Sequence, residues 1–203
     1  DTMKETEKIP SEVSESEFEN RVDLREEQIF TIDGDDTKDI DDAISLDILD
    51  NGNYKLGVHI ADVSYYVKKD SYLDKEARER GTSVYLADRV IPMLPHKLSN
   101  GICSLNPGAD RLAVSCVMEI NNKGDVVDYD IFPSVIKSKK QMTYKKVNEI
   151  LEQNKIPEGY EEFATKLIKM QELAKILRDN KVRRGYIDFG IDEAKIIVND
   201  EGK

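Results

Sequence analysis

The sequence predicts an α+β fold, with a mostly antiparallel sheet and with helices inserted between the strands and flanking them. Two tight-turn signals, at residues 50–53 and 122–125, each separate two segments that have the composition of strands. In the last third of the chain, apolar residues recur instead at helical spacing. Strands that come first and helices that follow favour α+β over an alternating α/β fold.

Alternation identifies the strands of the first half. Ile44, Leu46 and Ile48 alternate with polar residues, which is the period of a half-buried strand. After the turn, every second residue from Tyr54 to Ile60 is apolar, which predicts the return strand. The other elements expected in this half are a strand at residues 28–33, a short helix at 72–80, and extended segments at 83–86 and 89–93.

The second half begins with a hairpin and continues with helices. Thr143 is a suitable N-cap for the first helix, because its hydroxyl can accept a hydrogen bond from a free backbone N–H. Apolar residues from Phe163 to Leu177 recur at helical spacing and predict the second, longer helix. The expected elements are strands at residues 111–121 and 126–138, helices at 144–153 and 158–183, and strands at 186–189 and 193–198.

Composition excludes several classes of protein. With 203 residues, 39% of them apolar, the chain can form the core of one large domain and is not disordered throughout. It has no run near the ~18 apolar residues of a membrane span and no apolar N-terminal signal segment. Cys103 and Cys116 form no CxxC pair. We therefore expect a cytoplasmic protein with reduced thiols and no membrane partner.

The negative charge is concentrated at one end of the chain. The net charge is −11, but residues 1–50 carry −13 and the remaining residues carry +2. Residues 1–20, rich in Glu, Ser, Lys and Thr, are expected to be a linker with one polar helix after Pro10. Residues 134–148 contain no acid, and their lysines either form a solvated face or neutralise a bound phosphate backbone. These lysines are Lys137, Lys139, Lys140, Lys145 and Lys146.

Six aspartates lie within ten positions, between two predicted strands, from Asp33 to Asp42. An extended backbone places Asp39 and Asp41 on one face, and Gly34 allows the chain to turn so that Asp33 approaches them. Two carboxylates ~4 Å apart repel each other by roughly 4 kcal/mol at an effective dielectric constant of 20. Mg²⁺ is a suitable counterion, and two such ions can activate water and stabilise a leaving oxygen in phosphodiester cleavage.

Two other interpretations of this segment must be weighed. Aspartate-rich loops between strands are often only solvated turns. A calcium-binding EF-hand loop requires Gly at its sixth position and Glu at its twelfth. Counted from Asp33, these positions hold Lys38 and Ile44, so that pattern fails. The spacing alone leaves the metal site and the solvated turn open.

A series of motifs resembles the ribonuclease II/R superfamily, and bacterial ribonuclease R more than ribonuclease II. The segment Asp33-x5-Asp39-Ile40-Asp41-Asp42 is similar to the catalytic aspartate signature of that family. Further blocks follow in the family order and at the family spacing. They are Val-His-Ile-Ala-Asp-Val-Ser-Tyr-Tyr-Val at 58–67, Arg-Gly-Thr-Ser-Val-Tyr-Leu at 80–86, Ile-Pro-Met-Leu-Pro at 91–95 and Leu-Ser-Asn-Gly-Ile-Cys-Ser-Leu-Asn-Pro at 98–107.

The resemblance implies a processive, Mg²⁺-dependent 3′-to-5′ exoribonuclease that acts on single-stranded RNA ends and releases nucleoside 5′-monophosphates. Asp33, Asp39, Asp41 and Asp42 would then hold the metal and position the scissile phosphate, with Asp41 the most critical for turnover. Tyr85 would stack on bases near the 3′ end, and stacking suits a nuclease that does not read sequence. By resemblance, Tyr144 would lie next to the reacting nucleotide. From the basic stretch, Lys137, Lys139 and Lys140 are the candidates for contacts to phosphates, with a solvated face as the alternative.

Other polar residues are given structural interpretations. Asp35 and Asp36 fall outside the signature and are expected to be solvated, and Tyr144 can also be an ordinary first-turn residue. His59 lies in a predicted strand and is expected to be a packed or a surface histidine rather than a metal ligand, and His96 is assigned no role. For Asp62, capping of a turn and a role next to the metal both remain open.

The resemblance also implies an incomplete catalytic unit. Residues 21–203 would form the N-terminal portion of an RNB-type catalytic domain, after the linker at residues 1–20. The cold-shock and S1 domains of the family, and the second half of its catalytic domain with a catalytic arginine, have no match here. We therefore expect the isolated chain to be inactive. The alternative is a non-catalytic RNA- or protein-binding module that keeps the fold.

Overall fold

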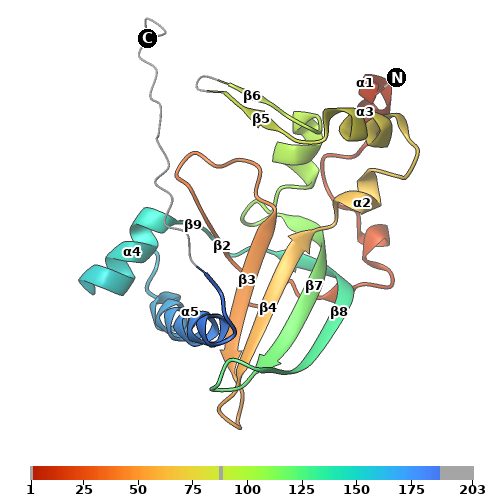
Figure 1. Ribbon diagram of the computed structural model, residues 1–203. Coiled ribbons are helices and arrows are strands. Elements are labelled where there is room, and N and C mark those ends of the chain that lie inside the picture. The colour runs from red at the N-terminus through yellow and green to blue at the C-terminus, as the bar shows by residue number, and fades with distance from the viewer. Residues whose placement is uncertain (1, 87–88, 188–203) are drawn as a thin grey trace, which may run out of the picture.

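A five-stranded sheet with the strand order β1-β8-β7-β4-β3 organises the molecule (Figure 1). The computed structural model describes residues 2–86 and 89–187. The strands of the main sheet are β1 (Val22–Asp23), β3 (Asp42–Ile48), β4 (Tyr54–Ala61), β7 (Asp110–Ile120) and β8 (Val126–Lys137). The two-stranded sheets are β2 (Thr31–Asp33) with β9 (Gln141–Thr143), and β5 (Val84–Tyr85) with β6 (Val90–Ile91). The helices are α1 (Thr2–Lys8), α2 (Val63–Tyr66), α3 (Tyr72–Arg80), α4 (Tyr144–Gln153) and α5 (Ala164–Arg183), with shorter helical turns η1 (Glu15–Phe18) and η2 (Lys97–Ile102).

The four long strands pair in antiparallel fashion, which confirms the predicted fold class. Ile44 pairs with Val58 across β3 and β4, and the same antiparallel pattern continues through β7 and β8. Gly52 and Gly124 lie in the two predicted turns with φ of 83° each, in the left-handed region that favours glycine. The turn chemistry therefore sets the register of both hairpins.

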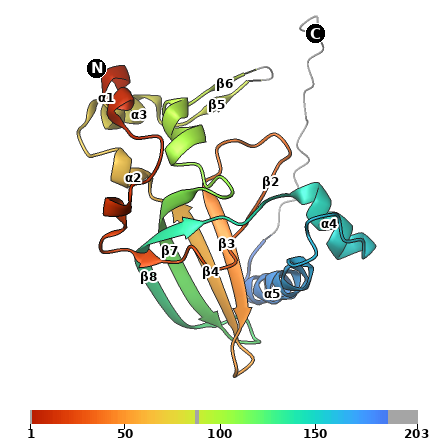
Figure 2. The same ribbon diagram turned by 180° about the vertical axis from the view of Figure 1, so that it is seen from behind.

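Two parallel pairings were not predicted. β1 pairs with β8 and β2 pairs with β9, each over only two or three residues. Segments this short have no readable periodicity. Figure 2 shows β2 passing from the main sheet toward the α4 side of the molecule. The second pairing matters for the site, because it places Asp33 opposite Thr143, the N-cap of α4.

Helix α5 covers one face of the sheet at the end where β3 finishes, whereas α1, α2 and α3 lie at the opposite end (Figure 1). Leu173 of α5 packs against Leu46, Tyr54 and Ile120 from three strands. A second apolar cluster joins α4 and α5 to the β2–β9 pair and includes Phe30. Within the described ranges, no helix combines the length and the apolar character that crossing a bilayer requires.

Several element boundaries differ from the predictions. After Pro10 there is only the single turn η1, whereas the longer helix α1 precedes that proline. The long helix begins at Ala164 rather than at residue 158, because Gly159 has a φ of 75° and the following residues form turns that bury Tyr160. The strands expected at 186–189 and 193–198 reach into or lie within the part of the chain outside the described residues.

Candidate functional site

The acidic site lies in the loop between β2 and β3. Asp33 ends β2 and Asp42 begins β3, so the two strands fix both ends of the loop. Ile40 in the middle is buried, and its backbone is held on both sides: its N–H donates to Ser104 Oγ at 3.0 Å, and its carbonyl accepts from Leu105 N at 2.9 Å. Because successive side chains alternate in extended backbone, burying Ile40 turns its two neighbours, both aspartates, away from the core.

The four signature aspartates interact electrostatically with one another. Burial is the largest cause that raises the pKa of Asp41, and the negative charges of Asp39, Asp42 and Asp33 raise it further. The pKa of Asp33 is also raised, again chiefly by burial, with contributions from Asp42 and Asp39. Among the described residues, no lysine or arginine forms an ion pair with any of the four. The site therefore concentrates negative charge that the described side chains do not neutralise by ion pairs.

One carboxylate oxygen at the site is poorly compensated. Asp33 Oδ2 is buried and meets no donor at hydrogen-bond geometry among the described residues, and the Thr31 side chain lowers the pKa of Asp33 only in part against the effect of burial. A buried charged oxygen with so little compensation is costly, so a cation at this point would stabilise it. Hard carboxylate oxygens are the ligands that Mg²⁺ prefers. The donor chemistry of Asp33, Asp39, Asp41 and Asp42 thus fits that ion.

The four aspartates lie farther apart than the ligands of a single bound metal ion would. In the described part of the chain, no three carboxylate, imidazole or thiol groups lie close enough together to hold one metal ion. The fold brings the four aspartates within electrostatic range of one another without gathering three of them around one point. Binding of a cation would have to draw the loop residues Asp39 and Asp41 toward the strand residues Asp33 and Asp42.

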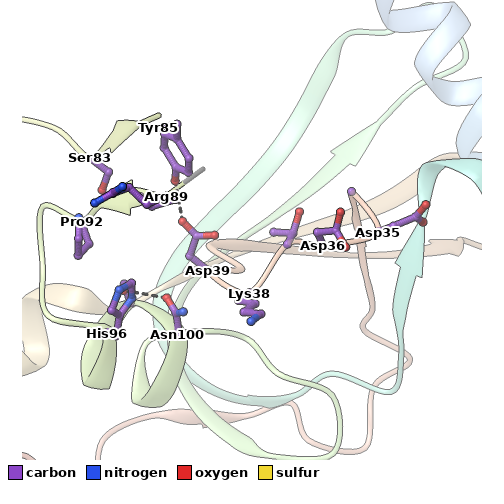
Figure 3. A pocket seen from close by; sticks show the side chains of 14 residues that line it. Asp35, Asp36, Lys38, Asp39, Ser83, Tyr85, Arg89, Pro92, His96 and Asn100 are labelled. Atoms are coloured by element: carbon purple, nitrogen blue, oxygen red, sulfur yellow. Dashed lines mark hydrogen bonds between the residues drawn. The ribbon is translucent and has the colours of Figure 1, made fainter. Parts of the chain in front are cut away.

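Tyr85 contacts the acidic loop directly. It lies on β5, in a hairpin that projects from the body of the molecule (Figure 1), and its hydroxyl donates a hydrogen bond of 2.7 Å to Asp39 Oδ2. That hydrogen bond is the main cause that raises the pKa of Tyr85. The side chain remains 65% exposed, so the ring is available for stacking. The residue predicted to stack on bases therefore lies beside a predicted metal ligand (Figure 3).

Two cavities adjoin this hydrogen bond. The larger, of about 710 Å³, lies between the loop at residues 34–39 and the β5–β6 hairpin. The smaller, of about 360 Å³, lies beside Asp39 and Asp41 and has mainly apolar walls, among them Ile60, Met93 and Leu94. Both volumes lie within the range of small-molecule sites. Side chains of Asp39, Ser83, Tyr85 and Ser99 line both cavities.

The larger cavity includes residues that the sequence did not single out. Figure 3 shows Arg89, His96 and Asn100 around the space in front of Tyr85 and Asp39, with Asp35 and Asp36 further along the loop. Asp35 and Asp36 are exposed, as predicted for solvated loop charges. Ser83, Ser99 and Asn100 lie inside the motif blocks that resemble the family, and only this resemblance could have indicated that they lie at the site. His96, which was assigned no role, lines the larger cavity.

The remaining predicted substrate residues lie outside these two cavities. Tyr144 is the first residue of α4 and is 62% exposed, one position after the residue that pairs with Asp33. Lys137 forms an ion pair of 3.0 Å with Asp110. Lys139 Nζ donates to a backbone carbonyl at 2.6 Å, and Lys140 Nζ lies 4.7 Å from the centroid of a tyrosine ring. Each of the three lysines therefore has a partner within the chain.

Two other polar residues have structural roles. Asp62 lies at the N-cap position of α2, but its carboxylate forms a 2.6 Å ion pair with Arg21 instead of capping the helix. Of the packed and surface positions expected for His59, the structure shows the packed one: the ring is buried between the hydroxyls of Ser45 and Ser115 at 3.1 and 2.7 Å. Burial lowers the pKa of His59 to about 4, so the ring is neutral at pH 7.

Comparisons with known proteins show what this chain is similar to. The sequence profile of the RNB domain family matches residues 21–203. The chain is 54% identical over 203 residues to ribonuclease R 1 of Lactococcus lactis, covering 100% of this chain and 25% of that protein. It is 54% identical to ribonuclease R of Thermotoga maritima, covering 100% of this chain and 29% of that protein. The chain therefore spans between a quarter and a third of the length of these relatives.

A solved structure has the same fold. Mycoplasma genitalium RNase R in complex with ribose-methylated single-stranded RNA superposes with a TM-score of 0.90 at 32% sequence identity, covering 99% of this chain and 31% of that chain. The mostly antiparallel sheet and its helices are thus those of the RNase R catalytic region.

Proposed function

This chain belongs to the RNB domain family, and we propose that it supplies the metal- and RNA-binding part of a Mg²⁺-dependent 3′-to-5′ exoribonuclease. The observation that carries the proposal is the concentration of Asp33, Asp39, Asp41 and Asp42 in a region where the described residues provide no cationic partner. Mg²⁺ bound there would activate water and stabilise the leaving oxygen of the RNA backbone.

The chain's own residues would bind and orient the 3′ end of the RNA. Tyr85 presents an exposed ring beside Asp39, and a base stacked on it would be held at the acidic loop. Tyr144 would approach from the opposite side, since the β2–β9 pairing places it next to Asp33. Lys137, Lys139 and Lys140 would contact phosphates only by exchanging their present partners, so we expect a smaller contribution from them.

The test is single-turnover digestion of a 3′-tailed RNA by the full-length protein. Asp41→Asn keeps the size of the side chain and removes its charge. We expect the rate of mononucleotide release to fall by about 10²–10³-fold, as when one preorganised electrostatic group is lost from a reacting centre. Asp50→Asn is the matched control, because Asp50 is an exposed aspartate in the turn at the far end of β3. An unchanged rate in Asp41→Asn, or an equal loss in both variants, would refute the proposal.

The second candidate function is a non-catalytic RNA-binding module. The raised pKa values of Asp33 and Asp41 favour the nuclease, because a module that only binds RNA has no use for a carboxylate cluster without a cation. A Mg²⁺ titration separates the two, since RNA binding by such a module would not depend on the metal. The isolated 203-residue chain is expected to lack activity, because by resemblance the arginine that stabilises the reacting phosphate lies elsewhere in the protein. Release of mononucleotides by that chain would overturn this expectation.

A further inference from the structure

A third cavity, with a different chemistry, lies at the C-terminal end of α5, where the helix meets the turn between β7 and β8. It has a volume of about 510 Å³. Among the described residues, its lining includes three cationic side chains, Arg178, Lys181 and Arg184, one aromatic side chain, Tyr186, and no carboxylate. Residues 51–203 together carry a net charge of only +2, so a lining with three cations and no acid among the described residues is more positive than this part of the chain on average.

The backbone at this point is fixed by a helix-ending motif. Gly185 has a φ of 91°, its N–H donates to the carbonyl of Val182 at 3.0 Å, and the N–H of Tyr186 donates to the carbonyl of Lys181 at 3.1 Å. This pair of hydrogen bonds is the Schellman arrangement. It turns the chain back so that Tyr186, 48% exposed, lies beside Lys181, with Nζ 5.2 Å from the ring centroid.

The other wall of the cavity is also held in place. Asn180 Nδ2 donates to the carbonyl of Gly124 at 2.8 Å and so fastens the β7–β8 turn to the helix. A Cβ on Gly124 would lie 3.2 Å from atoms of Asn180 and Ile176, which shows how closely the turn approaches α5. The cationic and aromatic groups are thus arranged on a supported surface rather than on a free tail.

Helix-end stabilisation does not account for this arrangement. Cations in the last turn of a helix interact favourably with the macrodipole, which could explain Lys181. The effect falls off beyond the last turn, and Arg178 lies five residues before the end of α5. It also gives no reason for an exposed tyrosine. Nor does it explain why the described residues on this side of Asn180 include no acid, when the cavity on its other side includes Asp125 and Asp179.

We propose that the cavity at the end of α5 is a second contact site for single-stranded RNA, in which Arg178, Lys181 and Arg184 contact phosphates and Tyr186 stacks on a base. Alternating cationic and aromatic contacts are the usual way to bind a single strand without reading its sequence. The proposal rests on the proposed function for its ligand, and it adds a site that is separate from the acidic loop.

The distance between the α5 site and the acidic loop predicts how long an RNA must be to contact both. Ala113 of β7 pairs with Ala61 at the acidic end of the sheet, and Ile120 adjoins the β7–β8 turn. At ~3.3 Å per residue, the seven steps between them span roughly 23 Å. One strand can therefore contact both sites only if it is several nucleotides long. The 5′ part of a long substrate would contact the α5 site while its 3′ end lies at the aspartates.

The test measures RNA binding without cleavage. Fluorescence anisotropy with a labelled single-stranded RNA of about twelve nucleotides, within the site sizes of single-strand binders, is followed in EDTA over a range of KCl concentrations. The triple variant Arg178→Gln/Lys181→Gln/Arg184→Gln is compared with Lys8→Gln/Lys69→Gln/Lys75→Gln, which loses the same charge elsewhere on the surface. The slope of log K against log salt is negative, and each lost phosphate contact makes it shallower by about 0.7. We therefore expect the slope of the first variant to be shallower than that of the wild type by about 2.

A second pair of variants tests the aromatic contact. Tyr186→Ala should weaken binding about five- to tenfold or more, whereas Tyr186→Phe, which keeps the ring, should bind like the wild type. Binding of a trinucleotide should be unaffected by any of these changes. Thermal melts check that the variants are folded. If the triple variant is not folded, the single change Arg178→Gln, at an exposed position, takes its place.

The outcomes separate this inference from the proposed function. Equal salt slopes in the two triple variants would overturn the inference and leave the nuclease proposal intact. A reduced slope, combined with an unchanged cleavage rate in Asp41→Asn, would support the α5 site and refute the nuclease proposal. Failure of the wild-type protein to bind RNA even at low salt would refute both.

Discussion

Aspartates occupy two contrasting environments in this molecule. Where β4 ends, the carboxylate of Asp62 lies 2.6 Å from the guanidinium of Arg21, and the two side chains are only 10% and 8% exposed. In the loop before β3, Asp33 and Asp41 have no such partner, and both pKa values are raised rather than lowered. Asp62, which has a structural role, is therefore neutralised within the chain. Asp33 and Asp41, which we propose to bind a cation, are not neutralised by any described residue.

Asp23, which is not part of the site, shows what a partner does. Its hydrogen bonds to Arg25 lower the pKa of this carboxyl to about 2. The chain can therefore provide an arginine for an exposed acid only two positions away. The lack of one at the signature aspartates is a property of that region and not of the composition, since the chain carries 30 lysines and arginines. The contrast predicts that removing charge has opposite effects on folding stability in the two regions.

The largest effect is expected at the buried pair. Arg21→Met leaves the Asp62 carboxylate buried without a cation and removes the hydrogen bonds from Arg21 to the carbonyls of Ala113 and Ser134. We expect a loss of about 3–5 kcal/mol in the free energy of unfolding, measured by urea denaturation. Arg78→Met breaks an exposed pair with Asp74 and should cost less than about 1 kcal/mol. Similar losses in the two variants would remove the contrast between buried and exposed pairs.

A smaller effect is expected when Mg²⁺ supplies the missing cation. A ligand that binds only the folded state stabilises it by RT ln(1 + [L]/Kd), about 1.4 kcal/mol at roughly ten times Kd. The wild-type chain should therefore melt at a higher temperature in MgCl₂ than in NaCl of equal ionic strength. Asp33→Asn should abolish that difference, whereas Asp50→Asn should retain it. A difference that persists in Asp33→Asn would place the bound metal elsewhere.

Local patterns in the sequence predicted the main sheet. Alternation at Ile44, Leu46 and Ile48 and the two turns with Gly52 and Gly124 carry enough information to pair β3 with β4 and β7 with β8. The β4–β7 pairing, which joins the two hairpins into one sheet, does not follow from them. The β1–β8 and β2–β9 pairings were missed because each depends on contacts more than a hundred residues apart in the chain. The start of α5 was misplaced because apolar spacing continues through residues that turn at Gly159.

The site was predicted only in part. The aspartate run and Tyr85 were identified from motifs, and the structure brings Tyr85 to Asp39. Nothing local in the sequence indicates that Ser83 and Asn100 line the same cavity as Asp39, since loops far apart in the chain meet there. The cations at the end of α5 were not predicted to form a site. Their common cavity depends on the Schellman turn at Gly185, which is visible only in three dimensions.

The smallest effect, and the most direct test of the contrast, is on the metal-free protein. Asp41→Asn removes a charge that is partly desolvated and is repelled by its neighbours, so in EDTA at pH 7 we expect it to stabilise the chain. The gain should be only about 0.5 kcal/mol, because solvent still reaches and screens this side chain. The folded-state pKa of Asp41 is above its ordinary value of 3.8, so the wild type loses stability as pH rises through that pKa. Below pH ~3.8 Asp41 is protonated in both folded and unfolded states, and the advantage of the variant should disappear. Urea denaturation at pH 7 and at acidic pH measures this difference. If Asp41→Asn is instead destabilised at pH 7, the Asp41 carboxylate already has a favourable partner in the folded chain. The acidic loop would then be neutralised within the chain, as Asp62 is, and the contrast between the two environments would be wrong.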